Sequence, residues 1–332
     1  MAAVRITAVH PPCAIEGGRI TIEGLGFPID GPSLPEVRVG GQRARLVHAA
    51  STELSAIVPA GLAGGRAAVR LASMPDDDSG FVDVATPFAN GLHQVDNPIF
   101  DRDGNLYVTY SGTRGQQVPV SIFRVRPDGT REPFSSGIVN PTSMAIDAQN
   151  RLYVSSRFEG TVYRVSPDGA AEPFAHDLGV ACGLAFSRHG VLFVGDRSGT
   201  IFRIDAIGRA ETFASLPPSV AAFHLAFGAD DALYVAGPTL SSCDQLYRIA
   251  PDGAVTTEAA RFGRPQGLAV DPGGTLFVIE ALAGSSGLYR LRPGKAPELV
   301  LSGPGLVGIA FDDDGRIVVT SNETAYRLSR SI

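Results

Sequence analysis

An eight-residue motif, VYRVSPDG at Val162–Gly169, recurs along most of this chain. Each copy carries an arginine after an aromatic residue, and these arginines are Arg124, Arg164, Arg203, Arg248, Arg290 and Arg327. Their successive spacings are 40, 39, 45, 42 and 37 residues. A period of about 40 residues is typical of repeat architectures. The fold must therefore be built from six similar units, of which the last ends at Ile332.

Most units contain three further short apolar runs around the arginine motif. In the second unit, SMAID at Ser143–Asp147 and LYVSS at Leu152–Ser156 precede the motif, and EPF at Glu172–Phe174 follows it. Dipeptides such as Asp314-Gly315 separate the runs, and they are typical of hairpin turns because glycine accepts positive φ angles. Four short antiparallel strands per repeat indicate the blade of a β-propeller.

The last unit lacks a fourth strand within the sequence. The segment Phe81–Asn90, which precedes the first unit, resembles the fourth strands of the other units. We therefore predict an all-β fold in which residues 81–332 form a six-bladed propeller. In this ring the N-terminal strand completes the last blade beside Ala325–Leu328, and closure removes exposed strand edges.

Residues 1–74 lack the repeat and contain short alternating segments such as Arg19–Glu23, which predict a small two-sheet sandwich. Turn motifs in this part stand at Pro11-Pro12, Gly17-Gly18, Gly24-x-Gly26-Phe27, Val39-Gly40-Gly41 and Val58-Pro59. Through these motifs the segment resembles the IPT/TIG immunoglobulin-like family. The resemblance implies a linking, dimerising or partner-binding module without a catalytic role. Residues 75–80, with three consecutive aspartates, are expected to be a linker.

Composition narrows the classes of partner. The chain has 332 residues and a formal net charge of −6, without a long run of one sign, so a nucleic-acid partner is not expected. No stretch reaches the ~20 apolar residues of a membrane span. Cys13, Cys182 and Cys243 lie too far apart for a disulfide framework or a zinc motif. We expect a cytoplasmic protein from the sequence as it stands, or an extracytoplasmic one if a signal has been removed. Its oligomeric state stays open.

The propeller segment resembles two families. Runs such as GLAVD at Gly267–Asp271 followed by LFVIE at Leu276–Glu280 resemble NHL repeats, and the whole segment is similar to the gluconolactonase/regucalcin family of lactone hydrolases. The second resemblance implies one divalent metal ion, calcium or zinc, at the mouth of the channel. Its ligands would be side chains that lie just before the first strands of the blades. Of the six corresponding positions, only Asp96 and Gln266 supply suitable oxygen atoms, so these two are the predicted metal ligands.

One face of the propeller is the expected location of a site. The connections from the fourth to the first strand and from the second to the third strand are longer than the Asp-Gly turns, and they share one face. The predicted substrate contacts on this face are Tyr110, Asn140, Arg157, Asp196, Arg197 and Asn322.

Two residues are candidates for proton transfer. Glu280 follows an apolar run, so it is a candidate general base, with ion pairing to Arg157 or Arg197 as the alternative. His224 replaces a glycine of the repeat and is a candidate proton shuttle, with a space-filling role as the alternative. Cys182 is a candidate nucleophile or an inert apolar residue. The arginines of the repeat are expected to form ion pairs between blades.

Two functions follow from these observations. In the first, a gluconolactonase-like hydrolase opens a lactone or related ester, with a metal near Asp96 polarising the carbonyl and His224 or Glu280 moving protons. In the second, a non-catalytic NHL-type propeller binds a small molecule, peptide, glycan or protein partner on the same face.

Overall fold

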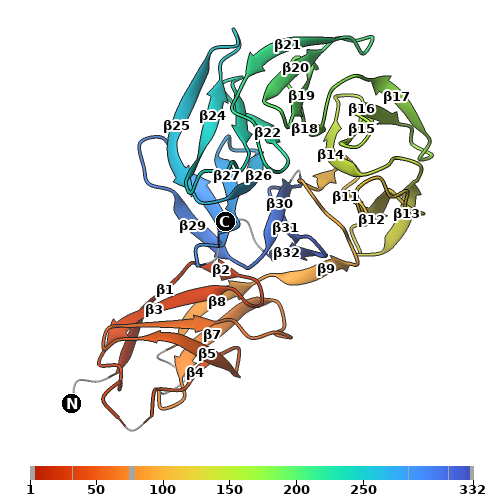
Figure 1. Ribbon diagram of the computed structural model, residues 1–332. Helices are drawn as coiled ribbons and strands as arrows, with labels where there is room; N and C mark the ends of the chain where they lie inside the picture. Colours follow the sequence, from red (N-terminus) through yellow and green to blue (C-terminus); the bar gives the residue numbers. More distant parts are fainter. Residues whose placement is uncertain (1–3, 32, 75–78, 283, 313, 330–332) are drawn as a thin grey trace.

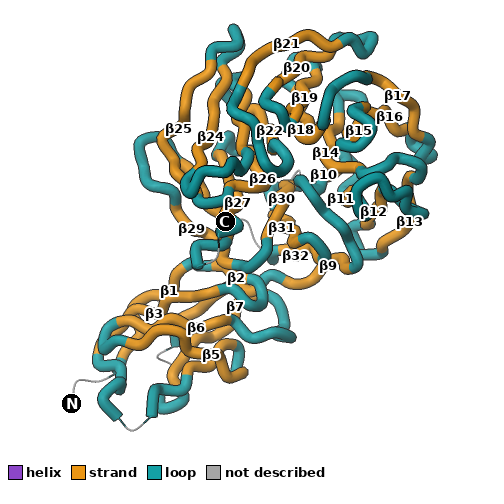
Figure 2. Tube along the Cα trace, viewed as in Figure 1, coloured by secondary structure: helices purple, strands orange, loops and turns teal. Residues whose placement is uncertain are grey.

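The chain folds into two all-β parts, a small sandwich and a larger ring of blades (Figure 1). The computed structural model describes residues 4–31, 33–74, 79–282, 284–312 and 314–329, and every regular element in these ranges is a β-strand (Figure 2). Accordingly, these ranges contain no helix with the length and apolar character of a membrane span.

The N-terminal part is the predicted two-sheet sandwich. One sheet has the strand order β1 (Arg5–His10), β3 (Arg19–Leu25), β6 (Glu53–Ile57) and β5 (Gln42–Ala49). The other contains β4 (Val37–Val39), β7 (Gly65–Leu71) and β8 (Gly80–Val84), and β5 pairs with both β6 and β4. Alternation along β3 turns Ile20 and Ile22 into the core between the sheets, where both are fully buried.

The boundary between the two parts differs from the one expected from sequence. Strand β8 pairs with β7 of the sandwich, although residues 81–84 were assigned to the propeller. Val82 and Val84 are buried in the sandwich core, and this burial keeps the segment with the N-terminal part. The propeller therefore begins with β9 (Thr86–Asn90), whereas residues 75–78 of the expected linker lie outside the described residues.

The ring contains six blades of four antiparallel strands within the described ranges. The bounds of the first three blades are β10 (Ile99–Phe100), β11 (Leu106–Thr109), β12 (Ile122–Val125), β13 (Arg131–Ser135); β14 (Pro141–Ile146), β15 (Leu152–Ser156), β16 (Thr161–Val165), β17 (Ala171–Ala175); and β18 (Ala181–Phe186), β19 (Leu192–Asp196), β20 (Thr200–Ile204), β21 (Ala210–Ser215). Those of the others are β22 (His224–Phe227), β23 (Leu233–Ala236), β24 (Asp244–Ile249), β25 (Val255–Phe262); β26 (Pro265–Val270), β27 (Leu276–Glu280), β28 (Gly287–Leu291), β29 (Glu298–Ser302); and β30 (Leu306–Phe311), β31 (Ile317–Ser321), β32 (Thr324–Arg327), β9.

The ring is closed by its own first strand, as predicted. Strand β9 pairs antiparallel with β32, with Asn90 opposite Thr324 (Figure 1). An apolar cluster that includes Val108 of the first blade and Val318 of the last blade fills the junction between them. Comparable clusters fill the other five junctions, so the blades bury apolar surface all round the ring.

A two-residue strand joins the sandwich to the ring. Strand β2 (Cys13–Ala14) lies parallel to β8 on one side and parallel to β29 on the other. The second sheet of the sandwich therefore continues through β2 into the fifth blade, and backbone hydrogen bonds couple the two parts directly.

The repeated motif owes its sequence to two contacts. A Cβ atom on Gly169 would lie 1.9 Å from the carbonyl oxygen of Phe134 in the neighbouring blade, and the φ angle of Gly169 is 89°, so only glycine fits. Arg124 contacts Glu132 at 2.5 Å, and Arg290 contacts Glu298 at 2.9 Å. These partners lie on adjacent strands of one blade, so the expected pairing between blades is corrected to pairing within a blade.

Candidate functional site

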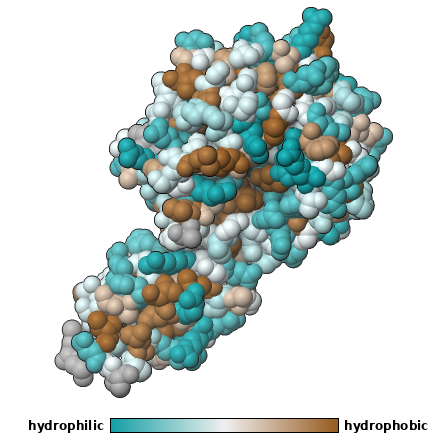
Figure 3. Space-filling view, viewed as in Figure 1, coloured by the Kyte–Doolittle hydropathy of each residue, from teal (hydrophilic) through white to brown (hydrophobic). Residues whose placement is uncertain are grey.

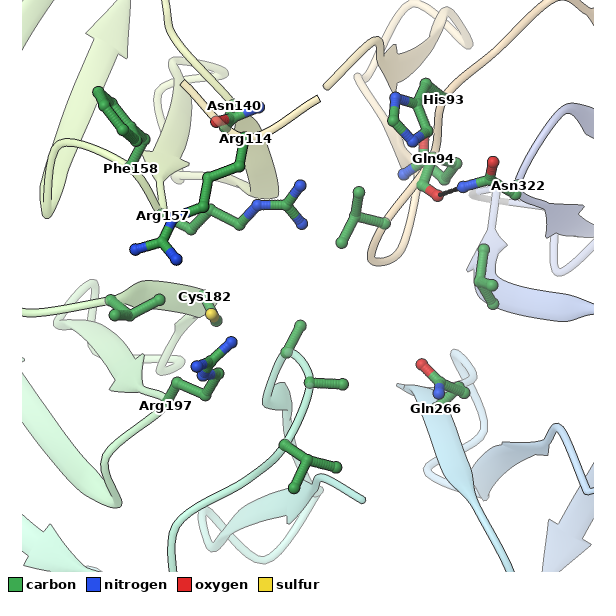
Figure 4. A pocket seen from close by; sticks show the side chains of 16 residues that line it. His93, Gln94, Arg114, Asn140, Arg157, Phe158, Cys182, Arg197, Gln266 and Asn322 are labelled. Atoms are coloured by element: carbon green, nitrogen blue, oxygen red, sulfur yellow. Dashed lines mark hydrogen bonds between the residues drawn. The ribbon is translucent and has the colours of Figure 1, made fainter. Parts of the chain in front are cut away.

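A cavity of about 480 Å³ occupies one end of the central channel. It is lined by residues at or just before the start of the first strands, such as Gln266 and Val180, and by residues that follow the second strands, such as Arg157. The cavity therefore opens on the face with the longer connections. Asn140, Arg157, Arg197, Gln266 and Asn322, all expected there, line it (Figure 4).

Three arginine side chains gather on one side of this cavity. Arg114, Arg157 and Arg197 follow the second strands of the first, second and third blades, and they lie opposite Gln266 (Figure 4). Among the described residues, none of the three guanidinium groups has an ion-pair or hydrogen-bond partner. This separates them from the arginines of the repeat, four of which pair with a glutamate of the same blade.

The cavity is electrostatically positive. Its lining includes no aspartate or glutamate among the described residues. Burial lowers the pKa of Arg157, and the positive charges of Arg197 and Arg114 lower it further, although a guanidinium stays protonated at neutral pH. Burial, reinforced by the charge of Arg157, also lowers the pKa of His93, so this imidazole is neutral at pH 7. An anion in the cavity would relieve the repulsion among the arginines.

Asn140 positions the loop that carries Arg114. Its Nδ2 donates to the carbonyl oxygens of Ser111 at 2.5 Å and Thr113 at 2.8 Å, and its Oδ1 accepts from the backbone N–H of Gly115 at 2.6 Å. These three hydrogen bonds occupy the side-chain amide of Asn140, which was predicted from the sequence to contact the substrate. Asn140 is therefore a positioning residue for Arg114, whose role the sequence analysis missed.

The carboxylates of Glu280 and Asp196 accept hydrogen bonds from backbone N–H groups and do not face a ligand site. The Glu280 carboxylate accepts from the N–H groups of Gly263 at 2.5 Å, Arg264 at 2.8 Å and Leu282 at 2.7 Å. Asp196 accepts in the same way from Val180 at 2.8 Å. Neither carboxylate lines the cavity, and no salt bridge joins Glu280 to Arg157 or Arg197 in the described chain. The geometry favours a structural role for both over the catalytic and substrate-binding roles expected.

His224 and Asp96 form a buried pair deeper in the channel. His224 Nδ1 is hydrogen-bonded to a carboxylate oxygen of Asp96, and both side chains are almost completely buried. Gln94 supports the pair, because its Nε2 donates to the Asp96 carbonyl oxygen at 2.7 Å. His224 Nε2 has no partner among the described residues. Neither side chain of the pair is part of the cavity lining, so the structure assigns His224 no contact with a ligand there.

The residues predicted to hold a divalent metal do not fit that role. Asp96 lines a separate cavity of about 340 Å³ on the other side of the channel, whereas Gln266 lines the mouth. Within the described ranges, no three His, Cys, Asp or Glu side chains are arranged to hold a metal ion. The arginines at the mouth would also repel a cation. We therefore derive no chemical step through a metal.

The other predicted residues have limited roles. Asn322 Nδ2 donates to the Gln94 carbonyl oxygen at 2.8 Å, which fastens the last blade to the segment before β10 (Figure 4). Tyr110 lies outside the cavity and packs edge-to-face with His93, with ring centroids 6.1 Å apart. Burial raises the pKa of the Cys182 thiol to about 12, so this residue at the cavity wall is a thiol and not a nucleophilic thiolate.

Comparisons with known proteins agree with both parts of the fold. Residues 5–73 match the model of the IPT/TIG domain. The solved structure of an auxiliary nutrient binding protein from Bacteroides ovatus is similar over 98% of this chain and 97% of that chain, with 14% identity and a TM-score of 0.56. A comparison with curated protein sequences gave no match.

Two enzymes resemble the propeller part. A gluconolactonase from Xanthomonas campestris is 19% identical over 74% of this chain and 88% of its own, with a TM-score of 0.60. A virginiamycin B lyase from Staphylococcus aureus is 14% identical over 70% of this chain and 94% of its own, with a TM-score of 0.51. At these identities the similarity establishes a propeller fold of the kind found in such hydrolases and lyases, and it establishes no activity.

Proposed function

We propose that the propeller mouth binds a small anionic ligand. The observation that carries this proposal is the group formed by Arg114, Arg157 and Arg197, whose guanidinium groups meet in one cavity without a carboxylate partner among the described residues. A chain with a net charge of −6 offers many carboxylates, so the absence of one from this lining is specific to the cavity. Planar guanidinium groups recognise carboxylate and phosphate oxygens through paired hydrogen bonds.

The arrangement of the two parts supports a binding role. One structural relative that covers nearly the whole chain, sandwich and propeller together, is an auxiliary nutrient binding protein. The sandwich has the form of an immunoglobulin-like module and is joined to the fifth blade through β2. A binding propeller with a rigidly attached module accounts for both features without requiring a catalytic group.

The test compares binding of inorganic phosphate by three forms of the protein. Phosphate should raise the melting temperature of the wild type, because a ligand that binds the folded state stabilises it. Arg157→Gln should weaken phosphate binding about tenfold or more, since it removes charge-assisted hydrogen bonds. Arg164→Gln is the matched control, because Arg164 lies on β16, the third strand of its blade, and pairs with Glu172 at 3.5 Å. Equal phosphate binding by wild type and Arg157→Gln would refute the proposal.

A second candidate is hydrolysis of a lactone or related ester, as the gluconolactonase resemblance suggested. The observation that favours it is the neutral imidazole of His93 in the same cavity as Arg157. His93 would take a proton from a water molecule while the water oxygen attacks the carbonyl carbon, and a guanidinium group would stabilise the resulting oxyanion. Collapse of that intermediate would break the ester C–O bond, and His93 would return the proton to the leaving alkoxide.

Turnover of a panel of lactones distinguishes the two candidates. Under the hydrolase candidate, His93→Gln should lower kcat about 100-fold or more, as loss of a general base does. His189→Gln is the control, because His189 is exposed and interacts with Asp231 at 3.2 Å. Absence of turnover in the wild type, or turnover unaffected by His93→Gln, would eliminate the hydrolase candidate and leave the binding role.

A further inference from the structure

We infer that the ligand is amphipathic, with a doubly charged anionic head and an apolar body that lies against the opposite wall of the cavity. This inference rests on the proposed anion site and specifies the chemical class of its ligand. Neither the resemblance to hydrolases nor the structural relatives assign such a ligand. It follows from how polar and apolar side chains are distributed around the ring.

The cavity lining is divided between two halves of the ring. The arginines come from the first three blades, whereas the fourth blade contributes Val220, Ala221 and Ala222. In a closed ring of six blades, the fourth blade lies opposite the first. Val307, which belongs to the sixth blade, also lines the cavity. Gln266 of the fifth blade supplies an uncharged polar group across from the arginines (Figure 4). A ligand that spans the cavity must therefore meet guanidinium groups at one end and methyl groups at the other.

Two apolar side chains of the cavity are open to solvent. Phe158, which lies beside Arg157 on the arginine side (Figure 4), is 53% exposed, and Val220, on the opposite wall, is 40% exposed, although both line the cavity. Exposed apolar side chains that share a concave site with specific polar groups indicate a ligand surface, because contact with the ligand would remove them from water. In the space-filling view, hydrophobic and hydrophilic surface lie side by side around the centre of the propeller (Figure 3).

The number of unpaired charges indicates the charge of the head group. Arg157 lies close enough to Arg197 and Arg114 for their charges to oppose its own. A single carboxylate would leave two of the three guanidinium charges without a counterion. A phosphate monoester or a pair of carboxylates compensates more of them and offers more acceptor oxygens. The cavity of about 480 Å³ is also of the size that holds small organic ligands and not only an inorganic ion.

Matched pairs of probes test the inference by titration calorimetry. Phenyl phosphate is compared with inorganic phosphate at pH 8, where both are mainly dianions, and benzylsuccinate is compared with succinate, so that the main difference within each pair is the apolar body. The probe with the aromatic ring should bind at least about tenfold more tightly in at least one pair, through burial of the ring against the apolar wall. The pair with the higher affinity identifies the head group, and either result supports the inference.

Variants of both walls separate the inference from the anion site itself. Val220→Thr keeps the shape of a partly exposed side chain, so the fold is retained. It should reduce the advantage of phenyl phosphate over inorganic phosphate by a few-fold and leave the affinity for inorganic phosphate unchanged. Equal affinity of both members of each pair would overturn the amphipathic ligand while the anion site stands. Absence of binding by every probe would overturn the anion site, and the inference with it.

Discussion

The three hydrogen bonds accepted by Glu280 predict a large and specific loss of stability on mutation. Glu280 is 3% exposed, and its carboxylate is the acceptor for the N–H groups of Gly263, Arg264 and Leu282. A hydrogen bond to a charged group contributes about 1.5–3 kcal/mol, and an unpaired buried donor costs a similar amount. With the lower value for each bond, Glu280→Ala should reduce the free energy of unfolding by about 4–5 kcal/mol.

The amide variant supplies an internal check on this reasoning. Arg264 and Leu282 both donate to Oε1, whereas Gly263 donates to Oε2. Glu280→Gln can keep the first two bonds through its single carbonyl oxygen and lose only the third. Its cost should therefore be about 2 kcal/mol, less than half of the cost of the alanine variant.

Urea unfolding of the two variants measures both costs, with the denaturant slope expected to stay unchanged. Glu323→Ala is the matched control, because that exposed glutamate side chain forms no bond among the described residues, and it should change stability by less than about 0.5 kcal/mol. Phosphate binding should persist in Glu280→Gln. Normal stability of Glu280→Ala combined with loss of turnover or binding would show that the carboxylate acts on a ligand.

Three further predictions concern the channel and its mouth. Asp96→Ala should lower the free energy of unfolding by about 3–5 kcal/mol, because it leaves the buried imidazole of His224 without its hydrogen-bond partner. Added calcium should stabilise neither the wild type nor this variant. Calcium-dependent stabilisation of the wild type alone would restore the metal site. The NMR titration of His93 should give a pKa below the ordinary value of 6.5. Because the unfolded chain then binds that proton at a higher pH than the folded protein, the free energy of unfolding should fall as the pH decreases from 6.5 through the pKa of the folded state. A pKa of 6.5 or higher would contradict the positive cavity. Asn140→Ala should loosen the loop that carries Arg114 and weaken phosphate binding about tenfold, with calorimetry as the measurement and unchanged affinity as the opposing result.

The architecture could be predicted because its signals are periodic. The repeated arginine motif fixes the number of blades, and the alternation within each run fixes which side chains face the junctions between blades. The register of the second strands also placed Arg157 and Arg197 at the cavity. The boundary at β8 was misplaced because the alternating pattern around Val82 and Val84 suits the core of the sandwich and the core of the propeller equally well. Only the pairing of β8 with β7 decides between the two.

The chemistry of the site was harder to predict because it depends on loops. Glu280 and Asp196 have the sequence context of candidate functional carboxylates, but the backbone of the preceding connection turns its N–H groups toward them. Arg114 belongs to a long connection without repeat register, so its position could not be read from the other blades. The long stretch between β11 and β12 was the one available signal, since long connections on the open face are where ligand contacts concentrate.

A crystal of the protein soaked in tungstate, a heavy oxyanion, would locate the anion site directly through its anomalous signal. We predict one dominant peak within hydrogen-bond distance of Arg157, between Arg114 and Arg197, and its loss in crystals of Arg157→Gln. A cavity without a peak in the wild type, or a peak confined to the paired arginines on the third strands of the blades, would contradict an anion site at the propeller mouth.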